Sequence, residues 1–311
     1  MTGSYFWLFL ASVAPILWAV SSVIDTYFVH DIYEDEYDGM IISGLFQIAP
    51  WAFVSFGIIN FAFPGIETAL WAFAAGAFLF LSYVFYFKTL FTFNDSALVQ
   101  ILWGVSVPMT PFLAWLIVDE VLLPIHYAGI AIAFIGVSIF GFDGKTANGK
   151  FLKVAILMLF SALFFSLNWV LGRKAYQLSG DFWSTYLIYC LGSASLSTLL
   201  LVLLDSAKEK ARRIFRLSRK FFIVFFLSET LAVVASLTSQ RAVSIAPAVS
   251  FVALIESLTP LFVIGVSFVA LVFAKRFNWD GVMSAYGNQL SYPWLKLMAV
   301  GLISIGIYII S

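Results

Sequence analysis

Two carboxylates interrupt long apolar stretches, and their setting indicates a polar site inside a membrane. Glu256 lies near the middle of "SFVALIESLTPLFVIG" (250–265), four residues before Pro260. Glu229 follows shortly after a basic boundary at Arg219. A charged side chain at the centre of a membrane helix costs roughly 2.5–3.5 kcal/mol, so such acids usually face a bundle interior or a watery cavity. Each acid therefore predicts either proton exchange or a counter-charge for a substrate amine or guanidinium.

Glu256 belongs to a stripe that has a counterpart earlier in the chain. One helix face carries residues at steps of four: Ala248, Val252, Glu256 and Pro260. An offset of 152 places Pro108 on Pro260 and gives the matching stripe Ser96, Gln100, Gly104 and Pro108. Proline relaxes helix bonding near both stripes. The stripes therefore predict two walls of one cavity, with Pro108 and Pro260 as hinges.

Other apolar segments carry polar and aromatic residues that extend this candidate site. The residues expected to bind substrate or couple an ion are Glu256, Glu229, Gln100, Trp18, Asp25, Asn168, Gln47, Trp103, Ser22 and Tyr83. The aromatic rings suit cation–π contacts with an amine. The competing interpretation is structural. In it, both glutamates are protonated or bond Asn168, Gln47 or a backbone carbonyl, Asp25 marks a helix end, and Trp18 and Trp103 pack.

Membrane-spanning helices are the elements that must position these residues. The 311 residues are 62% hydrophobic, 18% aromatic and 11% charged, which excludes a water-soluble domain of ordinary surface. A span needs about 20 mainly apolar residues. Ten such runs occur, at 5–27, 39–63, 67–90, 95–118, 122–142, 151–174, 182–204, 219–240, 245–274 and 293–310. Short connections predict one bundle, multi-pass in the plasma (inner) membrane.

The basic residues follow the parity of these spans. Of the 17 basic residues, 14 lie in or beside the odd-numbered connections. By the positive-inside rule this puts these connections in the cytoplasm and both termini outside. The N-terminal segment lacks a basic region and a cleavage site, so it predicts the first span and not a signal peptide. The stretch "KEKARRIFRLSRK" (208–220) predicts an amphipathic surface segment in contact with anionic lipid head groups.

The chain also contains an internal repeat. "IGVSI" at 135–139 resembles "IGIYI" at 305–309, each in the last helix of its half. The offset there grows to 170, so the connection 275–292 is expected to carry an insertion of 18 residues relative to the first half. Five helices in each half make the second half enter the membrane from the opposite side. We therefore expect two inverted five-helix repeats, 1–144 and 145–311, around a central cavity.

Three segments resemble the EamA-like branch of the drug/metabolite transporter superfamily. They are "ILWAVSS" (16–22), "SALVQILWGVSVPMTPFLAWLIVDEVL" (96–122) and "HYAGIAIAFIGVSIFGF" (126–142). The resemblance covers nearly the whole chain in helix count. It implies that helices 5 and 10 stand apart while eight others surround the cavity, and that the cargo is an amino acid or related amine, moved outward. The ninth helix departs from the pattern, because it ends in "VFAKRF" (272–277) without an acid equivalent to Glu120. Eukaryotic members of this family often have both termini in the cytosol, whereas the distribution of basic residues here predicts both termini outside.

The leading hypothesis is a secondary transporter of a small polar metabolite, which works by alternating access with proton or ion coupling. The alternative is a non-transporting membrane scaffold or partner-binding subunit, in which the buried acids pair internally. An enzyme is not expected, because His30, His126 and the lone Cys190 form no metal cluster or nucleophile dyad. We expect no cofactor, no metal and no nucleic-acid partner, and the partners are the substrate and the lipid bilayer.

Overall fold

The described part of the chain is built from helices. The computed structural model describes residues 5–93, 96–140, 150–277 and 293–310, and these contain no strand. The helices are α1 (Phe6–Asp31), α2 (Glu36–Phe46), α3 (Trp51–Ser55), α4 (Ile66–Phe93), α5 (Ser96–Trp103), α6 (Ser106–Val118), α7 (Pro124–Phe140), α8 (Lys150–Ser179), α9 (Phe182–Leu203), α10 (Ala207–Lys220), α11 (Phe222–Ile245), α12 (Val249–Glu256), α13 (Thr259–Phe277) and α15 (Pro293–Ile310).

The fold is that of a multi-pass membrane protein. Within the described ranges, six helices are long and apolar enough to cross a membrane. The apolar helices Ser106–Val118 and Pro124–Gly136 are shorter. Each of the ten expected ranges contains helix. The predicted boundary at 144/145 and the expected insertion at 278–292 lie outside the described residues.

Three of the expected helices are interrupted, which corrects the continuous ranges 39–63, 95–118 and 245–274. The range 39–63 breaks after α2, because Pro50 has no N–H to continue the helical hydrogen bonds. Residues 56–65 are not helical. The third breaks between α12 and α13. There Thr259 Oγ1 donates to the carbonyl of Glu256 at 2.6 Å, the bond that Pro260 cannot supply. A side-chain hydroxyl thus satisfies a carbonyl that the helix leaves free.

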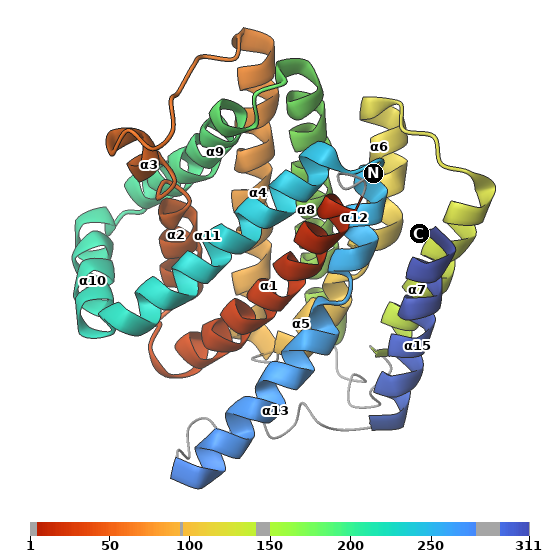
Figure 1. The fold of residues 1–311 in the computed structure, drawn as a ribbon. Coiled ribbons are helices and arrows are strands. Elements are labelled where there is room, and N and C mark those ends of the chain that lie inside the picture. Colours follow the sequence, from red (N-terminus) through yellow and green to blue (C-terminus); the bar gives the residue numbers. More distant parts are fainter. Residues whose placement is uncertain (1–4, 94–95, 141–149, 278–292, 311) are drawn as a thin grey trace.

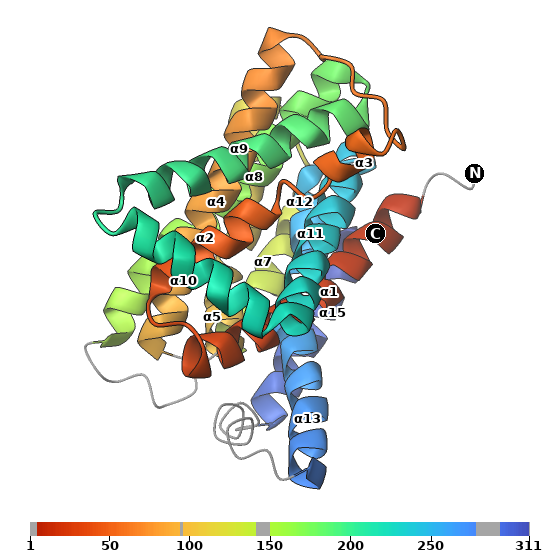
Figure 2. The same cartoon turned by 90° about the vertical axis from the view of Figure 1, so that its left-hand side faces the viewer.

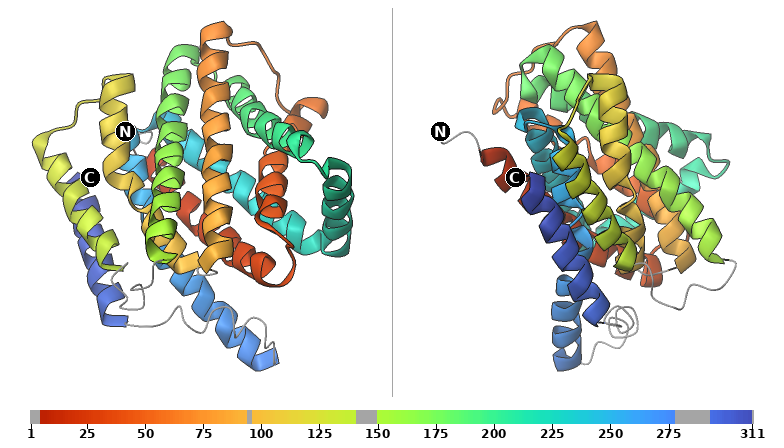
Figure 3. Two further views of the ribbon diagram at one scale, coloured as in Figure 1. Left: turned by 180° about the vertical axis from the view of Figure 1, so that it is seen from behind. Right: turned by 90° about the vertical axis from the view of Figure 1, so that its right-hand side faces the viewer.

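The helices pack in two layers with a separate pair at the side. In Figure 1, α1 and α11 run side by side across the front, and Figure 3 shows α4 and α8 side by side at the back. Helix α9 also packs along α4. Figure 2 shows α10 on the outside of the bundle next to α2. Helices α7 and α15 pack on each other away from this core, as the resemblance implies for helices 5 and 10.

Two glycines allow α4 and α9 to approach closely. A Cβ at Gly76 would collide with the backbone carbonyl of Tyr189, and a Cβ at Gly192 would collide with that of Phe73. Small residues at crossings are how membrane helices gain packing contacts, because lipid supplies no hydrophobic drive between them. This crossing fixes one layer against which the polar centre is built.

Candidate functional site

A small chamber lies between the break that separates α5 from α6 and the break that separates α12 from α13. Its lining comes from α1, α5, α8 and the α12–α13 break, and consists of Trp18, Gln100, Trp103, Gly104, Ser106, Phe165, Trp169, Glu256, Ser257, Thr259 and Pro260. The free space is sufficient for about two water molecules. Gln100 and Glu256, predicted from the paired stripes, therefore do line one cavity. We call this cavity the central chamber.

Three buried polar atoms of the central chamber have no partner among the described residues. They are Nε1 of Trp18, Nε1 of Trp103 and Oε1 of Glu256. The side chains carrying them are only 9%, 9% and 6% exposed. Buried donors and acceptors are nearly always paired. Two indole donors and one carboxyl acceptor are therefore available to a ligand or to water in this chamber.

Glu256 is held in place from α11. The hydroxyl of Ser239 lies beside its carboxyl group and accepts a bond from Nε1 of Trp169 at 3.0 Å. Aromatic rings stack along the same wall, with Phe165 4.6 Å from Trp103 and 4.5 Å from Trp169 between ring centroids. Rigid rings and a fixed hydroxyl therefore set the direction of the Glu256 carboxyl group.

A second chamber adjoins the first across a shared partition of Trp18, Gln100 and Trp103. It has room for about one water molecule and is lined also by Ser21, Ser22, Asp25, Ser43, Tyr83, Tyr86, Phe87 and Ala232. Gln100 Nε2 donates to Ser22 Oγ at 3.2 Å, the hydroxyls of Ser22 and Tyr86 lie 3.1 Å apart, and Tyr86 donates to Asp25 at 3.3 Å. A continuous hydrogen-bonded chain therefore joins the partition to Asp25.

Glu229 lies deeper than either chamber. It is 1% exposed and does not line the described chambers. Its Oε1 accepts from Ser43 at 3.0 Å, while Oε2 has no partner among the described residues. Asp25 is close enough to repel it electrostatically. Glu229 and Asp25 thus share one buried neighbourhood next to the second chamber.

Three predicted residues lie beside the chambers and not in their lining. Asn168 accepts from Gln240 Nε2 at 3.1 Å, and Gln47 donates to the Tyr83 hydroxyl at 3.4 Å. Among the described residues neither amide bonds Glu229 or Glu256, so these amides are not the partners that the structural interpretation offered. Pro108 lies in the first turn of α6 without lining the central chamber.

Sequence reasoning missed Ser43, Tyr86 and Ser239. The first two carried a signal, because Ser43 precedes Gln47 by one turn and Tyr86 follows Tyr83 by three residues. Ser239 directly precedes Gln240, so it lies on a neighbouring face of α11. No pattern distinguishes it, since its role depends on where α8 crosses α11.

One end of the bundle is closed by contacts that Glu120 and Arg173 make with helix ends. The carboxylate of Glu120, after α6, accepts from the N–H of Val249 at 2.8 Å and of Ser250 at 3.2 Å, at the start of α12. Arg173 Nη1 on α8 donates to the carbonyl of Val243 at 2.8 Å near the end of α11. A carboxylate on free helix N–H groups and a cation on free carbonyls both complement the helix ends.

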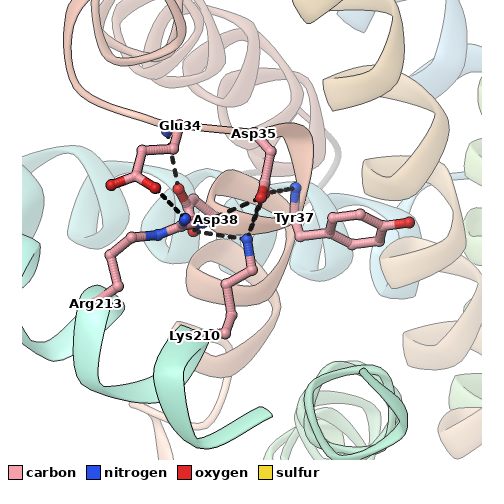
Figure 4. Close-up of polar contacts among 6 residues, drawn as sticks. All are labelled: Glu34, Asp35, Tyr37, Asp38, Lys210 and Arg213. Atoms are coloured by element: carbon pink, nitrogen blue, oxygen red, sulfur yellow. Dashed lines mark hydrogen bonds and ion pairs between the residues drawn. The ribbon is translucent and has the colours of Figure 1, made fainter. Parts of the chain in front are cut away.

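The other end is closed by the ion cluster drawn in Figure 4. Lys210 and Arg213 of α10 bind Asp35 and Asp38 at the start of α2, and Arg213 also bonds Glu34. The side chains of Asp38 and Lys210 are 0% and 5% exposed. Two cations of the stretch expected on lipid head groups therefore point inward. We call these five residues the α2–α10 ion cluster.

The ion cluster determines the charge state of its acids. Burial by itself pushes the pKa of Asp35 upward, but the hydrogen bonds and charges of Lys210 and Arg213 outweigh it. Together they lower the pKa of Asp35 below its ordinary value of 3.8. Asp38 and Asp35 in turn raise the pKa of Arg213, against the opposing effect of burial. Asp35 and Arg213 are thus ionised at neutral pH.

Comparisons with known proteins show the fold and not the activity. No family model matches the sequence, and no curated protein matches it. A solved structure described only as "Crystal structure of protein" is similar, with a TM-score of 0.60 and 15% identity. The match covers 99% of this chain and 96% of that one. At such low identity the likeness concerns the helical arrangement alone, and it extends over nearly the whole of both chains.

Proposed function

We propose that this protein is a secondary transporter that moves a small polar metabolite through the central chamber by alternating access. The observation that carries the proposal is the position of Glu256. It lies at the break between α12 and α13, facing Trp18 and Trp103, with buried polar atoms of all three unpartnered. Interrupted helices that line a polar cavity in the middle of the bundle are the usual setting of transporter substrate sites.

The two helix breaks support an inverted repeat of five and five spans. The first falls at residues 104–105 and the second at 257–258, and the offset of 152 maps 104–105 to 256–257. The packing repeats as well. The first helix of each half packs on the opposite half. Helix α8 packs on α4 and α6, and α1 packs on α11 and α13. This pairing is expected of ten spans related by an axis in the membrane plane.

The closed ends support alternating access. The chambers hold only about three water molecules together, so a metabolite needs the halves to separate. Glu120 bridges the two halves on one side, and the α2–α10 ion cluster bridges them on the other. Releasing one set while the other stays engaged opens the chamber to one side. Pro108 and Pro260, each in the first turn after a break, are the proposed hinges.

The lining indicates which cargo the central chamber suits. Glu256 offers an acceptor for an amine, and the indole N–H groups of Trp18 and Trp103 are donors for a carboxylate or another acceptor. An amino acid or a related amine carries such groups. The EamA-like resemblance points to the same cargo and to export from the cell across the plasma membrane. Asp25 is joined to the partition through Tyr86 and Ser22, and Glu229 is bonded to Ser43 in the lining of the second chamber. These two acids are the proposed site of proton coupling.

One observation favours a second candidate, a non-transporting scaffold. Asp25 and Glu229 find partners in Tyr86 and Ser43, as expected of acids that only stabilise the bundle. In that case the specificity lies on the outer apolar faces. Transport activity separates the two candidates.

The test is uptake by reconstituted liposomes. The purified protein is first screened by thermal shift against amino acids, amines, nucleosides and sugar nucleotides, since a bound ligand stabilises the native state. Uptake of the best ligands is then measured for the native chain, Glu256→Gln and the control Glu67→Gln, which removes an exposed carboxylate at the start of α4. Uptake abolished only by Glu256→Gln supports the proposal. No uptake above empty liposomes in any class, or equal uptake by both variants, contradicts it.

A further inference from the structure

A groove opens on the outside of the bundle where α10 meets α11. Its volume is about 410 Å³, within the range of ligand-binding sites. Its only polar lining residues are Ser218 and Arg219. Aromatic rings form the rest, from Phe46, Phe215, Phe222, Phe225 and Phe226. The groove is thus an apolar trough with a cation on its rim.

The inner wall of the groove, at Phe225, is fixed before any ligand arrives. Phe225 is 2% exposed, and its ring stacks on Phe28 of α1 at 4.4 Å between centroids. Phe222 and Phe226 stack on each other at 5.8 Å. On the opposite side of α10, Lys210 is tied to Asp35 and Asp38. A preformed groove binds with little cost for ordering its own side chains.

The exposed side of α10 is strongly basic. Lys208, Arg212, Arg216 and Arg219 follow at steps of four, four and three, so they share one face of the helix. With Lys220 they are all exposed, and none forms an ion pair within the described residues. Glu209 is the only acid of α10. Arg219 belongs both to this basic stripe and to the groove.

We infer that the groove binds an anionic phospholipid, with an acyl chain against the phenylalanines and the phosphate on Arg219. The place fits, because α10 is amphipathic and leads directly into α11, a helix long enough to cross the membrane. Its junction therefore lies at the level of the head groups. A guanidinium binds phosphate oxygens through paired donors, and the Ser218 hydroxyl adds a further donor. The remaining cations of the stripe favour an acidic over a zwitterionic head group.

The test is lipid binding measured by native mass spectrometry in detergent, with phosphatidylglycerol and phosphatidylcholine compared at equal chain length. Arg219→Gln is compared with Arg216→Gln, which removes the same charge from the same stripe outside the groove lining. One surface charge contributes about fivefold in affinity. We expect the native chain to prefer phosphatidylglycerol, and Arg219→Gln to weaken this binding at least fivefold while Arg216→Gln weakens it less.

A second variant separates the groove from simple charge attraction. Ser218→Phe fills the groove and leaves every cation in place, so it is expected to displace the lipid while the unfolding midpoint stays near the native value. Equal binding of the two lipids, equal losses in the two arginine variants, or undiminished binding by Ser218→Phe would each overturn the inference. None of these outcomes depends on transport, so the inference stands or falls separately from the proposed function.

Discussion

Lys210→Met should destabilise the protein far more than Lys208→Met, the same change two residues away. The Lys210 ammonium lies 2.5 Å from Asp35 and 3.3 Å from Asp38 in a nearly buried setting. Removing one partner of a buried ion pair leaves an uncompensated charge and costs about 3–5 kcal/mol. Arg213 still binds both acids, so the lower figure, about 3 kcal/mol, applies. The apolar Met chain fills much of the volume left by the lysine stem.

Thermal unfolding of the purified protein in detergent measures this loss. About 3 kcal/mol corresponds to a fall of roughly 6 °C in the unfolding midpoint for a chain of this size. Lys208→Met is the matched control, because Lys208 is on the same helix but exposed. We expect its midpoint to stay within about 1 °C of the native value, as surface substitutions usually do.

A double variant shows whether the buried charge is the cause. Asp38→Asn removes the acid that Lys210→Met leaves short of a partner, so the pair of changes should cost less than the sum of the two single changes. If Lys210→Met unfolds at the same temperature as Lys208→Met, or if the two single costs simply add, the ion cluster does not hold α10 to α2 and this reasoning is refuted.

Three further outcomes follow from single positions. Gly76→Ala should destabilise by about 1–3 kcal/mol in thermal unfolding, because its Cβ meets the α9 backbone; Gly265→Ala, with nothing within 4 Å, should be neutral or stabilising. Glu120→Gln should cost about 1 kcal/mol and speed amide exchange at the start of α12, because it weakens a charge-assisted cap, whereas Asp119→Asn should do neither. The lowered pKa of Asp35 contributes stability that is present above its ordinary pKa of 3.8 and is lost as the pH falls through the lowered folded value. Unfolding midpoints measured from pH 5 to pH 2 should therefore fall less steeply for Asp35→Asn, and an unchanged slope would contradict this.

Periodicity and composition predicted the parts of the site that lie on continuous stripes. Apolar runs located every helix in the described chain except α10, which was expected as an amphipathic surface stretch. The offset between Pro108 and Pro260 predicted that Gln100 and Glu256 face one cavity. These features depend on local chemistry, because proline, small residues and rare buried acids carry their meaning in the sequence itself.

The rest depends on tertiary contacts that no local pattern contains. Ser239 reaches Glu256 only because α8 and α11 cross at Trp169. The inward turn of Lys210 and Arg213 was hidden, because half of the residues of α10 are basic and only the packing against α2 decides which cations are buried. The break near Gly104 had a signal in Pro108, which cannot donate to the Gly104 carbonyl, but the sequence alone does not decide whether a proline kinks a helix or interrupts it.

The most direct test of the account is the accessibility of the central chamber from the two sides of a sealed membrane. Ser257, in the lining, is replaced by cysteine after the native, buried Cys190 is changed to alanine. A membrane-impermeant thiol reagent is then applied to right-side-out and inside-out vesicles, with Ser193→Cys, buried at 0% exposure outside the chambers, as the control. Alternating access predicts that Ser257→Cys is labelled from either side while Ser193→Cys is labelled from neither. Labelling of Ser257→Cys from one side only, or from neither, would contradict the central claim.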